Sequence, residues 1–474
     1  MAGVQIVTGS GATNTVDEEA ISTLASGLDG KLIQQDDAGY DEARQIWNAM
    51  IDKRPALIVQ CASKSDVVAA VNFGREHGLL TAVRGAGHNI AGKAVCEGGL
   101  MIDLSEMKQV NVDVDNRRAT VEGGATLGDF DAATLEHGLA TPTGINSTTG
   151  IAGLTLGGGF GWLSRKYGMT DDNLLSADVV TADGSQLHAS EDENSDLFWA
   201  IRGGSGNFGI VTQFEFQLHQ VGPDLLSGLI VFPRSQAKDV LRKYAEFSSS
   251  MPEELNVWVV MRKAPPLPFL PEDVHGTDVI ILALCYSGDP AEGEALVEPI
   301  KSFGEPVGVM VGAQPFTAWQ QAFDPLLTTG MRNYWKSHNF TEISDGLIDA
   351  VVEQAGKLPS PHCELFFAAL GGATSRPAPD AMAYSHRDAN YVMNVHGRWE
   401  TADEDAAVIA WAREVFEATK PFASSGVYVN FITEDEDDAR IASAYGVNQT
   451  RLSELKKKYD PNNFFRLNQN IQPA

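Results

Sequence analysis

Apolar residues in the first half of the chain occur in short runs between turn residues. Residues 56–62 (ALIVQCA) and 79–83 (LLTAV) are apolar and β-prone, which predicts two strands. Between them, residues 63–78 place Val67 and Val71 on one helical face, with a capping Ser63 and a closing glycine. More short strands are predicted at 99–105, 110–114 and 118–124, and a helix at 126–138. This half is therefore expected to be an α+β unit dense in turns.

Longer apolar runs and fewer glycines mark the middle of the chain. Residues 225–233 and 278–288 predict strands, and residues 291–303 and 405–419 predict amphipathic helices. We expect an antiparallel sheet with helices on one face. The proline-rich residues 262–276 are expected to form an exposed connection.

The last fifty residues differ again from the middle of the chain. Residues 428–439 (YVNFITEDEDDA) predict a strand and an acidic loop, and a helix is expected from Thr450 to near Pro461. The changes of pattern predict four parts, which are an N-terminal extension (1–54), a first domain (55–220), a second domain (221–420) and a C-terminal segment (421–474).

Composition narrows the class of protein. The 474 residues carry a formal net charge of −28, which disfavours nucleic acid and anionic membranes as partners. No apolar run is long enough to span a membrane and the N-terminus lacks a signal-peptide pattern, so a cytoplasmic monomer or small homo-oligomer is expected. The four cysteines form no CxxC pair, and no metal site is predicted. The acidity fits either a high-salt habitat or a soluble surface.

Two glycine-rich loops carry the first sign of chemistry. They are residues 84–89 (RGAGHN) and residues 144–161 (GINSTTGIAGLTLGGGFG). Glycines let backbone N–H groups converge on an anion such as a diphosphate, and Arg84, Thr148 and Thr149 can add donors. A Rossmann site is the rival interpretation. It is disfavoured because no acidic residue ends the next strand and no regular βαβ series follows.

Several motifs, in order along nearly the whole chain, resemble one family. VRGAGHNIAG (83–92), the block 158–184, DLFWAIRGGSGNFGIVT (196–212), YVNF (428–431) and YDPNNFFRLNQNI (459–471) are similar to the FAD-linked oxidases that include berberine bridge enzyme, glucooligosaccharide oxidase and 6-hydroxy-D-nicotine oxidase. The resemblance implies an α+β fold of the vanillyl-alcohol-oxidase type. In that fold a two-subdomain FAD-binding domain is followed by a substrate domain with an antiparallel sheet, and the C-terminal segment returns to the first domain.

The resemblance also assigns residues to the cofactor. It implies that His88 bonds covalently to the 8α-methyl carbon of the flavin, because a neutral imidazole is a nucleophile near pH 7. Family members with a second link use a cysteine where this chain has Asn146, so a single link is expected. The residues expected to contact FAD are Arg84, Gly85, Ala86, Gly87, His88, Asn89, Thr148, Thr149, Gly150, Gly153, Gly158, Gly161, Asn173, Val211, Asn468 and Asn470.

The catalytic residues implied by the family are Tyr428 and Asn430, which on a strand would share one face. Tyr428 would take a proton from the substrate as hydride passes to flavin N5. A phenol has a pKa near ~10, so this base needs donors or positive charge nearby. Weaker candidates for contact with substrate are Glu364, Phe366 and Tyr391, and Glu364 is a possible orienting partner of Tyr428. Trp335, Lys336 and His338 in NYWKSHNF are weaker still.

The leading hypothesis is an FAD-dependent oxidase with a small organic substrate, oxidised at a C–OH or C–N carbon, and with O2 reduced to H2O2. A flavin dehydrogenase with another electron acceptor is the alternative within the same class. A non-catalytic flavin or small-molecule binding protein is the alternative from another class. It is disfavoured because His88, Tyr428 and Asn430 occur together.

Overall fold

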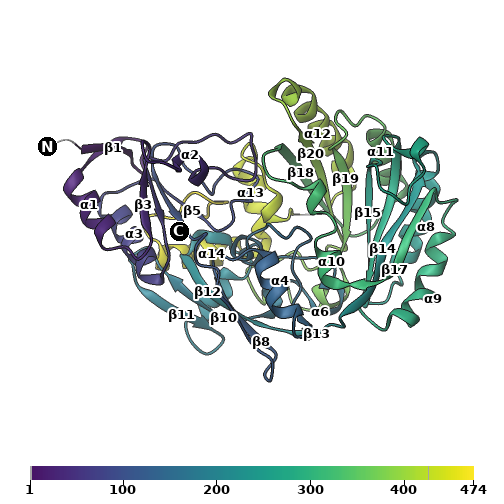
Figure 1. Cartoon of the computed structure of the whole chain (residues 1–474), viewed down its shortest axis with the longest axis horizontal. Helices are drawn as coiled ribbons and strands as arrows, with labels where there is room; N and C mark the ends of the chain where they lie inside the picture. Colours follow the sequence, from purple (N-terminus) through teal and green to yellow (C-terminus); the bar gives the residue numbers. More distant parts are fainter. Residues whose placement is uncertain (1–2, 425) are drawn as a thin grey trace.

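The computed structural model describes residues 3–424 and 426–474 and has the mixed helix and sheet content expected from the sequence (Figure 1). A four-stranded sheet contains β3 (Lys31–Gln34), β4 (Leu57–Gln60), β6 (Leu100–Asp103) and β5 (Thr81–Arg84), in that order. Strands β4, β6 and β5 are parallel, and β3 is antiparallel to β4. The proposed domain boundary at residue 54 therefore falls between two paired strands.

Helix α3 (Lys64–Glu76) covers this sheet with the face that carries Val67 and Val71, both fully buried. Ser63 caps its first turn, as the sequence predicts. The buried Asp66 carboxylate accepts hydrogen bonds from the backbone N–H groups of Asp29, Gly30 and Ala62 at 2.8–2.9 Å. These bonds fasten the N-terminal residues to the first sheet. The elements before β4 are β1 (Gly3–Val7), β2 (Thr13–Asp17), α1 (Glu18–Ser26) and α2 (Tyr40–Ala43).

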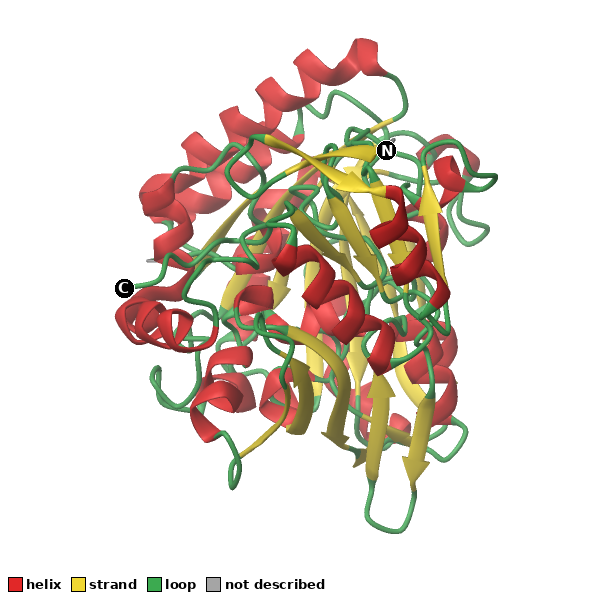
Figure 2. Cartoon of the chain, turned by 90° about the vertical axis from the view of Figure 1, so that its left-hand side faces the viewer, coloured by secondary structure: helices red, strands yellow, loops and turns green. Residues whose placement is uncertain are grey.

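A second, antiparallel sheet completes the N-terminal half (Figure 2). Its strands in spatial order are β11 (Gln186–Ser190), β10 (Leu174–Val180), β12 (Ile210–Gln217), β8 (Arg118–Glu122) and β7 (Val110–Asp113). Helix α4 (Leu127–Leu135) begins with a capping box between Thr126 and Asp129. The remaining elements are β9 (Leu139–Ala140), α5 (Ile151–Leu156), α6 (Ser164–Tyr167), α7 (Ser195–Ile201) and β13 (His219–Gln220).

The C-terminal half is built on one seven-stranded antiparallel sheet, which confirms the predicted sheet type. In spatial order its strands are β17 (Gly308–Pro315), β14 (Asp224–Pro233), β16 (Asp278–Tyr286), β15 (Leu255–Lys263), β19 (Glu364–Ala369), β20 (Tyr391–Trp399) and β18 (Arg332–Phe340). Helices cover its outer face, and the inner face turns toward the N-terminal half (Figure 1). These helices are α8 (Ala237–Ser248), α9 (Pro290–Lys301), α11 (Asp345–Ala355) and α12 (Asp405–Thr419), and the short α10 (Phe316–Gln320) contacts α4.

The end of the chain returns to the N-terminal half through α13 (Asp438–Tyr445) and α14 (Gln449–Tyr459). Lys456 and Asp460 form a fully buried ion pair at 2.7 Å, and the Lys456 ammonium also donates to the carbonyl oxygen of Asn207. The strand predicted from Tyr428 is wrong, because Val429–Phe431 form a single 3-10 turn. No described helix has the length and apolarity needed to cross a membrane.

Candidate active site

A cavity of about 340 Å³ lies between the two halves of the molecule. Its walls come from glycine-rich loops on one side and from the inner face of the seven-stranded sheet on the other. The segment around Tyr428 and the residues near Asn468 close it further. The cavity therefore collects residues from distant parts of the sequence.

The loop after β5 presents backbone donors to this cavity. The backbone N–H groups of Ala86, Gly87, His88 and Asn89 form no hydrogen bond to any described residue, and all four residues line the cavity. Gly87 has a φ of +77°, a conformation that favours glycine and turns the chain here. Consecutive free N–H groups of this kind form an anion-binding concavity.

Arg84 does not supply the extra donor that the sequence suggested. Its guanidinium lies outside the cavity wall and pairs with the buried carboxylate of Asp103, with Nε–Oδ1 at 2.9 Å and Nη2–Oδ2 at 2.6 Å. Its third hydrogen bond goes to the carbonyl oxygen of Gln45. Arg84 thus joins β5 to β6 and holds the base of the loop.

His88 lies in the cavity wall with its ring stacked on Trp47, at a centroid separation of 4.9 Å. Its Nε2 atom lies 2.9 Å from the hydroxyl oxygen of Thr148. Burial, and then the positive charge of Arg398, lower the pKa of His88 to about 3. The imidazole is therefore neutral over the working pH range, which is the form required of a nucleophile.

The second glycine-rich block lies against the first. Gly150 is so close to Ala86 that a Cβ atom at residue 150 would lie 2.9 Å from the Ala86 nitrogen. Thr149, Gly150 and Gly153 line the cavity, as does Val211. Thr148 is exposed and does not line the cavity, and its hydroxyl donates to the Asn146 side-chain oxygen at 2.7 Å.

Besides Arg84, Thr148 and Asn470, three more residues predicted to contact a cofactor lie outside the cavity wall, and these are Gly158, Gly161 and Asn173. A Cβ atom at Gly161 would lie 1.8 Å from the Thr143 carbonyl oxygen, so this glycine allows close backbone packing. Gly158 has a φ of +111° and packs against Tyr384. The Asn173 amide donates to two carbonyl oxygens of the turn before it. The contacts of these three residues in the structure are thus backbone packing and turn hydrogen bonds.

Asn146 lies in the cavity wall, where the family resemblance places a second linking cysteine in other members. Its side-chain nitrogen donates to the carbonyl oxygen of Leu327, and its oxygen accepts from the N–H of Thr148. All four cysteines are described, and none of them lines the cavity. The wall thus offers no thiol to a ligand.

Tyr428 and Asn430 lie together at the cavity, although no strand carries them. The turn at 429–431 brings the Asn430 amide nitrogen to 3.1 Å from the Tyr428 hydroxyl oxygen. The backbone N–H of Gly159 donates to the same oxygen at 3.1 Å. Burial raises the pKa of Tyr428 above its ordinary value of 10.0, and these two hydrogen bonds lower it. Glu364 makes no contact with Tyr428, so it is not the orienting partner.

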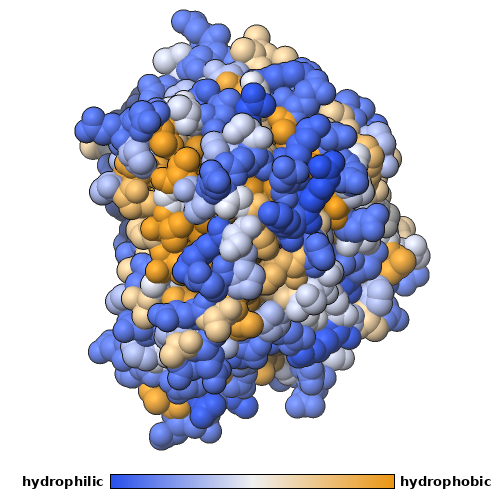
Figure 3. All heavy atoms as spheres, turned by 90° about the vertical axis from the view of Figure 1, so that its right-hand side faces the viewer, coloured by the Kyte–Doolittle hydropathy of each residue, from blue (hydrophilic) through white to orange (hydrophobic). Residues whose placement is uncertain are grey.

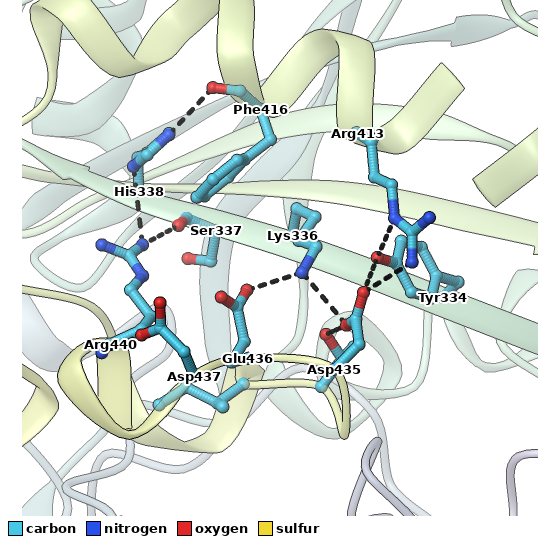
Figure 4. Close-up of polar contacts among 12 residues, drawn as sticks. Tyr334, Lys336, Ser337, His338, Arg413, Phe416, Asp435, Glu436, Asp437 and Arg440 are labelled. Carbon is cyan, nitrogen blue, oxygen red and sulfur yellow. Dashed lines mark hydrogen bonds and ion pairs between the residues drawn. The ribbon is translucent and has the colours of Figure 1, made fainter. Parts of the chain in front are cut away.

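An acidic loop follows this turn and is fixed to the edge strand β18 (Figure 4). The Lys336 ammonium donates to Asp435 at 3.1 Å and to Glu436 at 2.8 Å. Asp435 also accepts from the Tyr334 hydroxyl at 2.6 Å and from Arg413 of α12 at 2.8 Å. Lys336 and His338 face α12 and this loop, so of the weaker candidates in this strand only Trp335 lines the cavity.

The inner face of the large sheet supplies the opposite cavity wall. Glu364 and Phe366 lie on it, as predicted, together with Arg262 and His396 of the neighbouring strands. Glu364 accepts from Arg262 at 2.7 Å and lies 3.2 Å from His396 Nδ1. Burial raises the pKa of Glu364, but Arg262 and the other positive neighbours outweigh it and hold the pKa at about 2.

Tyr391, the third predicted substrate contact, lies on the outer face instead. Its hydroxyl bonds to Ser248 at 2.6 Å, and its ring packs near Tyr244 of α8. All nine residues of β20 are buried, so hydrophobicity alone does not show which alternate set faces the cavity. Asn394, His396 and Arg398 form a polar series at alternate positions, and this series marks the inner face of β20. It is the sequence feature that could have shown that Tyr391 faces the other way.

Five side chains of the cavity wall have buried polar atoms without a partner among the described residues. These are the indole nitrogens of Trp162, Trp258 and Trp335, both amide atoms of Asn394 and the side-chain oxygen of Asn468. Buried polar groups are nearly always hydrogen-bonded in native proteins, so unpaired atoms at a cavity indicate a missing ligand or water. Of the two C-terminal asparagines, Asn468 lines the cavity and Asn470 does not.

Comparisons with known proteins agree with this geometry. A protein-family model described as "FAD binding domain" matches residues 55–190, and one described as "Berberine and berberine like" matches residues 427–472. An FAD-linked oxidoreductase of Dictyostelium discoideum is 32% identical over 98% of this chain and 98% of its own length. (R)-6-Hydroxynicotine oxidase of Paenarthrobacter nicotinovorans is 30% identical over 94% of this chain and 97% of its own length.

The chain belongs to the berberine-like family of FAD-linked oxidoreductases. A crystal structure of 6-hydroxy-D-nicotine oxidase from Arthrobacter nicotinovorans matches the fold with a TM-score of 0.85 at 28% identity. That match covers 94% of this chain and 99% of the crystallised one. The predicted family, fold class and enzyme class are thereby confirmed.

The residues present fit the FAD that the family binds. The unpaired backbone N–H groups of residues 86–89 suit a diphosphate. The same cavity is lined by the His88 side chain and by Tyr428. Besides the predicted residues, the wall of this FAD-linked oxidoreductase includes Trp47, Arg262 and the turn 205–209. Trp47 has no recognisable signal in the sequence, because it reaches the cavity from the N-terminal residues only after folding.

Proposed function

We propose that this protein is an FAD-dependent oxidase of a small organic molecule, which it oxidises at a C–OH or C–N carbon. FAD is bound through one covalent link, to His88, and O2 is reduced to H2O2. The observation that carries the proposal is that neutral His88 and the doubly hydrogen-bonded Tyr428 hydroxyl meet in one cavity with the free N–H groups of residues 86–89.

Each residue has a distinct role in this proposal. The loop N–H groups bind the diphosphate, and His88 holds the flavin ring in place for every turnover. When bound, FAD accepts hydride from the substrate carbon and passes the electrons to O2. Asn146 leaves His88 as the only attachment point, since no cysteine lines the cavity wall.

Tyr428 is the proposed general base. Its oxygen takes the proton from the substrate O–H or N–H, and the donors Asn430 and Gly159 stabilise the phenolate that this requires. The range of substrates has support from two relatives that are named as oxidases of very different molecules. One is (R)-6-hydroxynicotine oxidase, and the other is a xylooligosaccharide oxidase from Myceliophthora thermophila, 25% identical with a TM-score of 0.84.

Acid precipitation of the purified protein tests the proposal. The yellow flavin absorbance should stay with the precipitated polypeptide of the wild type and move to the supernatant in His88→Ala. His77→Ala serves as the control, because His77 lies outside the cavity wall. Flavin released by acid from the wild type would overturn the covalent link.

A panel of alcohols, amines and sugars under air then tests the activity. Substrates should bleach the flavin without O2 and give peroxide with it. Bleaching without peroxide would indicate a dehydrogenase, and no bleaching by any compound would favour a binding protein.

A further inference from the structure

Four charged or titratable side chains lie together on the inner face of the large sheet. Arg262, Glu364 and His396 are direct neighbours across β15, β19 and β20, and Arg398 follows His396 by two residues on the same face. Glu364 bonds to both Arg262 and His396. Burial lowers the pKa of His396, so it adds no charge at neutral pH.

Arg398 has no counter-charge. It is 2% exposed, and its Nη2 donates to the carbonyl and hydroxyl oxygens of Thr328. Its Nε and Nη1 atoms are buried without a partner, and no described carboxylate lies within ion-pair distance. Two guanidinium groups therefore face one carboxylate, which leaves an excess positive charge in this wall. A buried charge without compensation is costly, so a negative group is expected to join it.

Arg262 is the member of the pair that reaches the cavity. It lines the wall next to Pro265 and Leu267, and its Nη1 atom is engaged by Glu364. Its Nη2 atom has no hydrogen bond to a described residue and is not among the fully covered atoms. This terminal N–H pair is available to a ligand in the cavity.

The wall beside Arg262 is flat and aromatic. The rings of Trp258 and Phe366 lie parallel, 5.9 Å apart at an angle of 7°, and both face the cavity. Trp335 and Asn394 also line this part of the cavity.

We propose that the substrate is a flat aromatic compound with an anionic group, such as a carboxylate, and that Arg262 binds this group. This inference rests on the proposed function, because it assumes that the cavity is the substrate site. The ring lies along Trp258 and Phe366, and Arg262 with Arg398 supplies the positive field. The net charge of −28 repels anions at long range, so the selectivity for an anion comes from the local guanidinium groups of this wall.

Isothermal calorimetry on the holoprotein with benzoate and benzamide tests the proposal. The two probes have the same flat shape and differ in charge. Benzoate should bind at least about tenfold more tightly than benzamide, as a charge-assisted hydrogen bond provides. Arg262→Met should remove most of this preference. Glu364→Gln should increase it, because Arg262 then loses its internal carboxylate.

Lys263→Met is the matched control. Lys263 is the next residue of β15, points to the other face and pairs with Asp278 at 3.0 Å. Its loss removes one positive charge without changing the cavity wall, so the preference for benzoate should stay. Flavin content and thermal unfolding show whether each variant is folded, and the opposite effects of Arg262→Met and Glu364→Gln cannot both come from misfolding.

Three outcomes would overturn the proposal. They are equal binding of the two probes, binding of neither at millimolar concentration, and a preference for benzoate that survives Arg262→Met. If the excess positive charge acts on the flavin ring instead, Arg262→Met should shift the flavin reduction potential, and the wild type should bind benzoate and benzamide equally. Calorimetry needs no turnover and no covalent flavin, so failure here is distinct from failure of the proposed oxidase activity.

Discussion

At the scale of single residues, the Tyr428 hydroxyl group combines two opposing influences. Burial raises its pKa, and Asn430 and Gly159 lower it by donating to its oxygen. The first influence keeps the phenol neutral in the resting protein. The second lowers the cost of forming the phenolate, which has to exist before the oxygen can accept a substrate proton in the proposed mechanism.

Tyr428→Phe should therefore lower kcat by about 10²–10⁴-fold while flavin stays bound. In the wild type, kcat/KM should rise with pH up to about 10, because the pKa of the base lies above its ordinary value and the basic form grows with pH. Stopped-flow flavin reduction at several pH values measures both. An unchanged rate or pH profile in the variant would contradict the assignment.

Asp131 gives a second prediction at this scale. Burial raises its pKa from 3.8 to about 7, although Gln320 and Thr143 donate to it. The folded state then binds more protons than the unfolded state between about pH 4 and 7, so stability should fall as pH rises through this window. Above pH 7 this contribution stays constant.

In Asp131→Asn, the stability should no longer fall as pH rises from about 4 to 7. The variant should gain a few degrees in Tm relative to the wild type at pH 8 and little at pH 4, measured by scanning calorimetry. The Oε1 atom of Gln320 is buried without a partner and can accept from the new amide. An equal difference at both pH values would contradict the pKa assignment.

At the scale of elements, side chains of β18 and α12 hold the acidic loop that follows Tyr428 (Figure 4). Lys336 on β18 joins two carboxylates of this loop, and Arg413 on α12 joins one of them. Arg440 at the start of α13 donates to the Ser337 carbonyl oxygen on the same edge strand. The 3-10 turn at 429–431 has no strand partner. The segment that follows it is held to β18 and α12 by these side-chain contacts.

Lys336→Met should loosen this turn while leaving flavin binding intact. Hydrogen exchange of residues 427–437 should become faster, with a local opening free energy lower by roughly 1.5–3 kcal/mol, and kcat should fall more than KM changes. Lys420→Met is the control, since Lys420 is exposed and makes only a 3.5 Å contact with Glu417. Exchange that rises equally across the whole chain would indicate general destabilisation instead.

At the scale of the whole molecule, charge and hydrophobicity are separated in space. The face formed by the outer helices is mostly hydrophilic with scattered apolar side chains (Figure 3). The apolar residues fill the cores under these helices and around the sheets. The net charge of −28 therefore lies mainly at the surface, where like charges repel one another.

Thermal stability should rise with salt for this reason. Raising KCl from about 0.1 M to about 1 M shortens the screening length from about 10 Å to about 3 Å and weakens this repulsion. The Tm should increase by several degrees at pH 7. The increase should shrink near pH 4.5, where carboxylates are partly protonated. A Tm that falls with KCl at pH 7 would show that favourable ion pairs dominate instead.

Many elements of this protein, and its family, were predictable from local patterns in the sequence. The 3.6-residue pattern and caps identified α3, α4 and α14, and apolar runs identified β4, β14 and β16. Local pattern suffices here because each helix buries residues of one face at helical spacing and each of these strands buries an apolar run. The ordered motifs likewise identified the FAD-linked oxidoreductase family, since glycine loops and His88 are contiguous features of the chain.

Which side of each element faces the cavity depends on long-range packing and could not be predicted from local pattern. Both faces of β20 are covered, so alternation could not separate Asn394 from Tyr391. The 3-10 turn at Tyr428 forms because Lys336, Gly159 and Leu154 bond to it and to its loop from distant parts of the chain. The sequence suggested that Arg84 contacts the cofactor. In the structure its guanidinium pairs with Asp103 on the neighbouring strand instead. Such partners are far apart in sequence, and folding alone brings them within hydrogen-bond distance.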